Sequence, residues 1–235
     1  MPATCSGLSE EQLQTYFREG YLVVEDLVPE STIDAVLVEA AKTPVVVGGS
    51  WTPRVFDHEN PDRESGLHRI LVEPSLVDAV ESILESPARV YYGMLAVVPA
   101  QGGKGLDWHQ DNMYDVVLGR ALNTFVALCD ITPNKAILWV APRTHLMGVQ
   151  ESLTTEGHRI AATPENGMPL PTLKKGSAVI FDRNTLHHSR RNETNEHRYA
   201  YAAQYQEDKA RNSAGIKDPL LRRVDDLRLR WQSLS

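Results

Sequence analysis

Residues 89–99 read RVYYGMLAVVP, a run rich in β-branched and aromatic side chains, and this composition is typical of a β-strand. Similar stretches follow at residues 123–130, 137–141, 177–182 and 198–206. The turn residues Thr132-Pro133-Asn134 separate the first two of these. Strands in succession, with turn signals between them, predict a mainly β protein with two packed sheets.

Helical patterns lie on both sides of this predicted core. In the first part of the chain, apolar residues recur at helical spacing over residues 9–18, 29–40 and 74–84. Ser9 is the expected N-cap of the first helix, and Gly20 is expected to stop it. The amphipathic segment 219–231 either docks on the core as a helix or serves a homodimer contact.

Charge and cysteine content exclude several classes of protein. Acidic residues outnumber basic ones by 31 to 24, giving a net charge of -7, whereas a nucleic-acid partner requires a concentrated basic face. Two cysteines exclude a disulfide framework and favour a reducing compartment. No apolar stretch approaches the roughly 20 residues that span a bilayer, and no signal-peptide pattern opens the sequence. We therefore expect a cytoplasmic protein with neither a nucleic-acid nor a membrane partner.

The segment Trp108-His109-Gln110-Asp111 carries a candidate metal site. In an extended chain, residues two apart project to the same side, so His109 and Asp111 can reach one metal ion. A third ligand can come from His187 or His188. Two imidazoles and one carboxylate form the facial triad of non-haem Fe(II) oxygenases, whose open positions accept a 2-oxo acid and dioxygen. The alternative is a structural His109 that is hydrogen-bonded to Asp111.

Arg198 favours the metal-site hypothesis. It begins the last predicted strand and shares a face with Ala200 and Ala202, while tyrosines occupy the other face. An inward guanidinium beside two small side chains is costly unless it meets an anion. The fork of an arginine suits a carboxylate, and the small neighbouring side chains would leave room for one.

The sequence resembles the phytanoyl-CoA dioxygenase-like (PhyH) family of Fe(II)/2-oxoglutarate oxygenases over residues 10–206. The similar segments are FREGYLVV at 17–24, WHQD at 108–111, ALCDITP at 127–133, LWVAP at 138–142 and TLHHS at 185–189, followed by Asn192 and Arg198. The turn at 134–136 reads Asn-Lys-Ala where the family usually has Asn-Gly. This departure leaves the triad intact but does not support transfer of a CoA-thioester substrate.

The resemblance implies a double-stranded β-helix, that is, a cupin-like jelly roll, in a single domain over residues 1–235. Its parts are a helical segment 9–86, a jelly-roll core 88–206 and a C-terminal helix 216–235. The resemblance also implies that His109, Asp111 and His187 bind the iron, that Arg198 binds the distal carboxylate of 2-oxoglutarate, and that Ser189 assists Arg198. In an extended chain Ser189 faces the same way as His187, which favours His187 over His188 as the ligand.

The implied function is an oxidoreductase: a dioxygenase, by default a hydroxylase, with Fe(II), 2-oxoglutarate and O2. It would oxidise a small molecule, for example in secondary metabolism, and release succinate and CO2. Desaturation, cyclisation and epimerisation share this chemistry. The rivals from other classes are a non-catalytic jelly-roll module that binds a small ligand and a zinc hydrolase, which leaves Arg198 unexplained.

The substrate-binding residues are less well defined by the sequence. Residues 43–66 are rich in Gly, Pro and charge, and are expected to form a long loop of the kind that often covers a site. A hypothesis is that the substrate mouth is lined by Trp51, Arg54, His68 and Tyr114. The alternative is an ordinary surface loop, with Tyr114 packed in the core.

Overall fold

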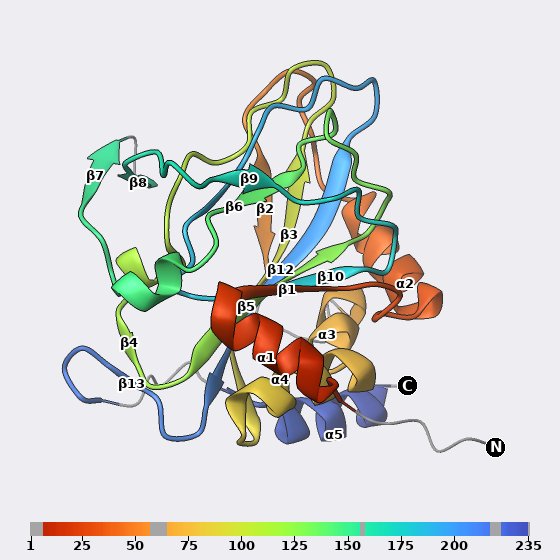
Figure 1. The fold of residues 1–235 in the computed structure, drawn as a ribbon. Helices are drawn as coiled ribbons and strands as arrows, with labels where there is room; N and C mark the ends of the chain where they lie inside the picture. The colour runs from red at the N-terminus through yellow and green to blue at the C-terminus, as the bar shows by residue number, and fades with distance from the viewer. Residues whose placement is uncertain (1–6, 57–64, 156–157, 217–221, 235) are drawn as a thin grey trace.

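The computed structural model describes residues 7–56, 65–155, 158–216 and 222–234. A seven-stranded antiparallel sheet crosses the middle of the molecule (Figure 1). In spatial order its strands are β1 (Tyr21–Val24), β10 (Ala178–Asp182), β5 (Ala121–Ala127), β12 (Arg198–Glu207), β3 (Ala88–Val98) and β14 (Arg222–Arg223), with β2 (Thr52–Val55) also paired to β3.

A smaller sheet faces the large one. It contains β11 (His187–Ser189), β6 (Leu138–Val140) and β9 (Met168–Pro169). Apolar side chains of both sheets form one buried cluster, in which Phe125 and Val179 of the large sheet meet Leu138 and Val140 of the small one. Two further strand pairs lie outside these sheets: β7 (Ser152–Thr155) with β8 (His158–Ala161), and β4 (Val117–Leu118) with β13 (Arg211–Asn212).

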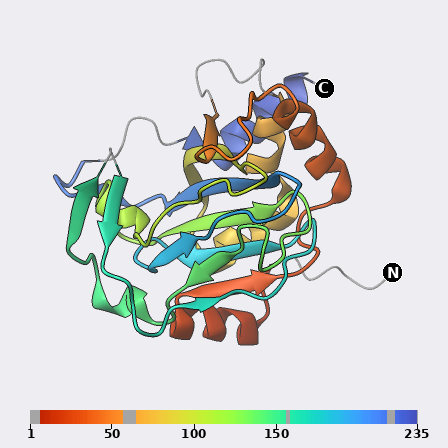
Figure 2. The same ribbon diagram turned by 90° about the horizontal axis from the view of Figure 1, so that it is seen from above.

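Helices pack against the other face of the large sheet. They are α1 (Glu10–Glu19), α2 (Glu30–Ala40), α3 (Ser65–Leu71), α4 (Pro74–Leu84) and α5 (Val224–Leu234). Figures 1 and 2 show α3, α4 and α5 gathered together beside this sheet. Their apolar side chains join the second face of the strands in the largest core cluster. On β12, the hydroxyls of Tyr201 and Tyr205 donate to the carbonyls of Leu67 and Leu71 in α3.

The architecture is a double-stranded β-helix with helices packed outside it, as the sequence predicted. Local signals were accurate: Ser9 caps α1, Gly20 ends it in a left-handed conformation, and α4 covers residues 74–84. No helix in the described part of the chain is both long and apolar enough to cross a bilayer.

Two expectations about irregular and terminal segments needed correction. The stretch 43–66 is not all loop, because β2 pairs with the edge of β3 and α3 begins at Ser65; residues 57–64 lie outside the described structure. The terminal helix begins at Val224 rather than residue 216, because Arg222–Arg223 pair with β3 as a short strand. Val224 and Leu227 are buried in the core. This helix therefore docks on the core, which was the first of the two alternatives expected for the segment.

Candidate active site

Two histidines from distant parts of the chain lie directly opposite one another. His109 and His187 form an antiparallel bridge, in which the backbone N–H of each donates to the carbonyl of the other at 3.0 Å. Directly opposed residues project their side chains to the same side of a sheet. The two imidazole centroids are consequently 4.2 Å apart, and both side chains are buried.

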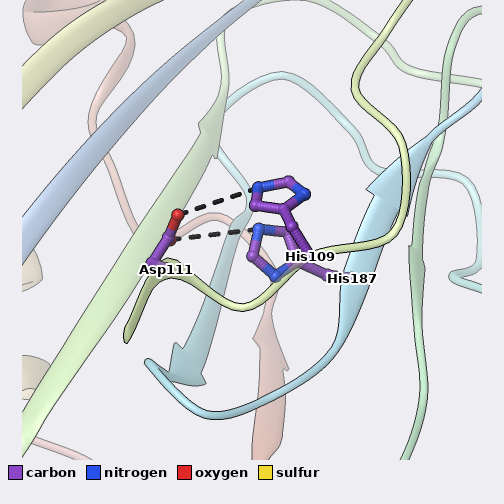
Figure 3. Close-up of side chains that lie close together, drawn as sticks. All are labelled: His109, Asp111 and His187. Carbon is purple, nitrogen blue, oxygen red and sulfur yellow. Dashed lines mark ion pairs between the residues drawn. The ribbon is translucent and has the colours of Figure 1, made fainter. Parts of the chain in front are cut away.

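Asp111 completes a compact group of metal-ligating atoms. The Nε2 atoms of His109 and His187 lie 3.7 and 3.9 Å from the two carboxylate oxygens of Asp111. Dashed lines mark these two pairs in Figure 3. One ligand atom from each residue lies within 4.8 Å of the others. Asp111 is not in an extended segment, because it begins a 3-10 helix, η2 (Asp111–Met113). His109 and Asp111 nevertheless reach the same point, as the spacing of the motif predicted.

Hydrogen bonds select the ring form that a metal requires. The Nδ1 atom of His109 lies 2.6 Å from the Asp107 carbonyl, and that of His187 lies 3.0 Å from the Thr185 carbonyl. A carbonyl oxygen can only accept, so each Nδ1 carries a proton, and in the neutral ring Nε2 is then the atom with a free lone pair. Burial, and after it the neighbouring His109, lowers the pKa of His187 to about 4, so this ring is neutral at pH 7. This donor set fits non-haem Fe(II).

The neighbours of the ligands anchor the motif. Gln110 is fully buried, and its side chain donates to the Gly148 carbonyl and accepts from the Gln150 backbone N–H. The amide of Asn123, on β5, donates to Asp111 Oδ2. His188 takes no part in the triad, because its ring packs 4.3 Å from that of Trp108, between centroids. The three candidate metal ligands are thus held in place by neighbouring side chains.

Arg198 begins β12 as a buried cation, 3% exposed. Its Nη1 donates to the Ala96 carbonyl at 3.3 Å, and its guanidinium lies 5.2 Å from the Phe125 ring centroid. Among the described residues, no acidic side chain forms a salt bridge with it, and its Nε has no hydrogen-bond partner. Burial lowers its pKa to about 10, so Arg198 remains charged at neutral pH. An anion that enters here would therefore meet an unneutralised guanidinium.

A pocket of about 440 Å³ connects the triad with Arg198. Its wall is largely apolar and aromatic, as in most small-molecule sites. The lining residues are Trp51, Tyr91, Tyr92, Met94, Ala96, Leu106, His109, Asp111, Tyr114, Asp115, Asn123, Phe125, Leu138, His158, Phe181, Arg183, His187, His188, Ser189, Arg198, Ala202, Ala203 and Gln204.

Of the four residues expected at the substrate mouth, two line the pocket and two lie elsewhere. Trp51 and Tyr114 lie in the pocket wall. Arg54 does not line the pocket, because it forms a salt bridge with Glu39 of α2 at 3.2 Å. His68 lies in the core at 0% exposure, with Nε2 2.7 Å from the Leu227 carbonyl. These two positions correct the expectation that all four residues surround the mouth.

Ser189 lies in the pocket wall, but its contacts differ from the expected one. Its hydroxyl oxygen accepts the backbone N–H of Leu106 at 3.2 Å. No hydrogen bond between Ser189 and Arg198 is present among the described contacts. The hydroxyl proton of Ser189 remains available to a ligand, because the bond to Leu106 uses the oxygen as an acceptor.

Several wall residues were not anticipated from the sequence. Gln204 pairs with Tyr92 and Tyr205 with Val90, so Tyr91 is an extra residue in β3. This β-bulge brings two successive tyrosines, Tyr91 and Tyr92, into the pocket wall. Gln204 could have been found by continuing the alternation from Arg198 through Ala200 and Ala202. The positions of Asn123 and Arg183 carried weaker signals, as polar residues within or just after apolar strands.

The fold and the site together define a class. Two facing antiparallel sheets enclose a pocket that brings two imidazoles and a carboxylate together, and this is the ligand set of mononuclear non-haem iron oxygenases. The chain belongs to the phytanoyl-CoA dioxygenase (PhyH) family, whose sequence profile matches residues 16–200.

Individual relatives agree with this class. Ectoine dioxygenase of Bordetella bronchiseptica is 27% identical, over 79% of this chain and 71% of its own length. EvdO2 from Micromonospora carbonacea var. aurantiaca, solved with 2-oxoglutarate, is similar in structure with a TM-score of 0.73 and 16% identity, over 91% of this chain and 96% of that one. The epimerase SnoN, solved with Fe3+, alpha ketoglutarate and nogalamycin RO, has a TM-score of 0.72 and 19% identity. The match covers 89% of this chain and 90% of the SnoN chain. At these identities the two structures support the fold.

Proposed function

We propose that this protein is an Fe(II)- and 2-oxoglutarate-dependent dioxygenase that hydroxylates, or otherwise oxidises, a small molecule and releases succinate and CO2. The observation that carries the proposal is the joint presence, in one pocket, of a His-Asp-His cluster and a buried arginine without an acidic partner among the described residues. His109, Asp111 and His187 hold the metal in this proposal. Arg198 holds the distal carboxylate of 2-oxoglutarate.

Bound Fe(II) supplies the redox chemistry by which dioxygen oxidises a C–H bond while 2-oxoglutarate is decarboxylated. The protein contributes placement. His109 and His187 offer their Nε2 atoms as ligands, because backbone carbonyls accept the Nδ1 protons and Nε2 is then the free donor atom of the neutral ring. The carboxylate of Asp111 is the anionic ligand of the proposed site, and the hydrogen bond from the Asn123 amide restricts rotation of this carboxylate.

Arg198 sets the orientation of the co-substrate. In a buried site, a guanidinium binds a carboxylate more strongly than it does in water, and its fork fixes the direction of the carboxylate. Phe125 and Phe181 lie in the wall of the same pocket and exclude water from it. A 2-oxo acid held at one end by Arg198 has its other end free to reach the metal ligands.

The remaining wall is the proposed substrate chamber. Trp51, Tyr91, Tyr92 and Tyr114 offer aromatic surface to a small organic molecule. The name of the relative ectoine dioxygenase supports a small-molecule substrate. Hydroxylation is the default outcome of this proposal, and epimerisation, the activity named for the structurally similar SnoN, is an alternative. The net charge of -7 and the two cysteines support a cytoplasmic enzyme without a nucleic-acid partner. A homodimer remains a prediction.

The decisive experiment measures complex formation without oxygen. Anaerobic addition of Fe(II) and 2-oxoglutarate to the protein should produce the weak visible charge-transfer band of a chelated 2-oxo acid. The His109→Ala variant should lose the band. His145→Ala, a histidine outside the pocket, should keep it. Absence of the band in the wild-type protein, or its persistence unchanged in His109→Ala, would contradict the proposal.

A further inference from the structure

A second buried arginine lies in the pocket wall. Arg183 immediately follows β10 and is 2% exposed. The proposed function assigns roles to the metal ligands and to Arg198, and leaves Arg183 without one. Its side chain therefore requires a separate explanation.

The guanidinium of Arg183 binds both sides of the turn that carries Asp111. Its Nη2 donates to the backbone carbonyl of Asp111 at 3.2 Å and to that of Asp115 at 3.1 Å. The backbone carbonyl of Arg183 accepts the N–H of Asn112 at 3.1 Å. The main chain and the side chain of Arg183 thus both form hydrogen bonds with η2 and with the residues that follow it.

The same guanidinium ties this turn to the large sheet. Its Nη1 donates to Gln204 Oε1 on β12 at 2.8 Å. Its central carbon lies 5.7 Å from the ring centroid of Tyr91, the bulged residue of β3. The turn is consequently connected, through a single side chain, to two central strands of the fold.

Burial of this cation is costly, and the cost indicates a specific role. Burial lowers the pKa of Arg183, although the nearby Asp111 acts in the opposite direction. No salt bridge to Arg183 is found among the described residues, and its Nε lacks a hydrogen-bond partner. An apolar side chain would fill the same space without desolvating a charge. The three donated hydrogen bonds, two of them to the ligand turn, are what an apolar side chain would lose.

The carboxylate of Asp111 depends on this turn for its direction. Its contacts in the described structure are the Asn123 amide and the two facing imidazoles. One amide restricts rotation of the carboxylate but does not fix its Cα position. That position is set by the backbone of η2, which Arg183 holds.

We propose that Arg183 is a positioning residue for the metal centre, acting through the backbone of Asp111 so that the carboxylate stays directed at the two Nε2 atoms. The proposal rests on the proposed metal-binding function. A lysine cannot replace it fully, because an ammonium cannot span the Asp111 and Asp115 carbonyls and Gln204 with a planar fork.

The test compares metal affinity in the wild-type protein, Arg183→Met and Arg183→Lys. Calorimetric titration of the metal-free proteins with Ni2+ gives a readout independent of turnover. Removing a group that orients a ligand typically weakens metal binding by about tenfold to a hundredfold. We expect Arg183→Met to fall in this range and Arg183→Lys to recover part of the loss. The control is Arg89→Met, which removes a salt bridge to Asp208 outside the pocket and should bind Ni2+ as the wild type does.

The outcomes separate the two proposals. Failure of the wild-type protein to bind Ni2+ would count against the proposed function itself. Binding by the wild type with equal affinity in a folded Arg183→Lys or Arg183→Met would overturn the role of Arg183 alone. Circular dichroism of the metal-free proteins identifies which variants are folded. If Arg183→Met does not fold, the comparison is made on Arg183→Lys, where unchanged affinity and an unchanged Ni2+ absorption spectrum overturn the proposal.

Discussion

Arg198 places a positive charge inside the protein without an acidic partner among the described residues. A charge in such a site reduces the stability of the ligand-free protein and strengthens the binding of an anion. The single hydrogen bond to the Ala96 carbonyl and the contact with the Phe125 ring compensate only part of the desolvation. In the proposed function, Arg198 therefore lowers the stability of the ligand-free protein and raises its affinity for 2-oxoglutarate.

Arg198→Met should therefore change affinity and stability in opposite directions. Truncating one partner of a buried charge pair costs about 2–5 kcal/mol of binding, which corresponds to a roughly 30-fold or larger increase in the dissociation constant for 2-oxoglutarate. The metal-free variant should be more stable to urea by about 1 kcal/mol or more, because the buried charge is gone. Titration of the Ni2+-loaded protein with 2-oxoglutarate and urea denaturation measure the two effects.

Arg89→Met is again the matched control, since it removes an arginine outside the pocket. It should leave 2-oxoglutarate affinity unchanged. An Arg198→Met protein that binds 2-oxoglutarate as tightly as the wild type would remove Arg198 from the co-substrate site.

At the scale of elements, the join between α1 and β1 connects the helical layer to the sheets. Gly20 ends α1 with a φ of 83°, and its N–H donates to the Tyr16 carbonyl at 2.7 Å. A Cβ at this position would lie 2.3 Å from His145 Nδ1 and 2.8 Å from Thr185 Oγ1. Gly20 therefore satisfies both a left-handed backbone and a close approach to neighbouring elements.

Gly20→Ala should destabilise the fold through both effects. A left-handed alanine costs about 1 kcal/mol or more, and the steric overlap adds roughly 1–3 kcal/mol. Gly215→Ala separates the two, because Gly215 has a φ of 75° and, among the described residues beyond its two chain neighbours, no atom lies within 4 Å of the added Cβ. Urea denaturation should show a loss of about 1 kcal/mol for Gly215→Ala and a distinctly larger loss for Gly20→Ala. Equal losses would show that the contact with His145 and Thr185 relaxes without cost.

At the scale of the whole molecule, the candidate metal site joins segments that the chain separates widely. His109 and Asp111 come from the connection after β3, and His187 begins β11 in the small sheet. The backbone bridge between the two histidines is one direct link between these segments. A metal ion bound to all three side chains would add a second link, present in the folded state and absent in the unfolded one.

Metal binding should therefore raise the thermal stability of the protein. At a free metal concentration of 100 times the dissociation constant, the gain is about 2.7 kcal/mol, which corresponds to a Tm increase of roughly 5–10 °C for a chain of this size. Ni2+ added to the metal-free protein should produce the shift, and EDTA should reverse it. Asp111→Ala should show little or no shift. A shift of wild-type size in that variant would indicate that the metal binds elsewhere.

The elements of this fold follow largely from local sequence. The caps Ser9 and Gly20 determine where α1 begins and ends, because they satisfy or redirect backbone groups within a few residues. The alternation from Arg198 assigns one face of β12 to the pocket and puts Tyr201 and Tyr205 on the helical side. The pairing of His109 with Asp111 was also readable from the motif, although the extended segment expected there is a turn that begins at Asp111.

The tertiary structure decided which distant residues meet. Strand register and contacts between remote segments determine three features of the site. These are the opposed positions of His109 and His187, the bulge at Tyr91 and the hydrogen bonds from Arg183 to the turn at Asp111. Arg54 shows the same limit, because its salt bridge with Glu39 of α2 becomes visible only in the folded structure. Local side-chain patterns specify the state of each segment, whereas the register between segments is set by the summed packing of the whole core.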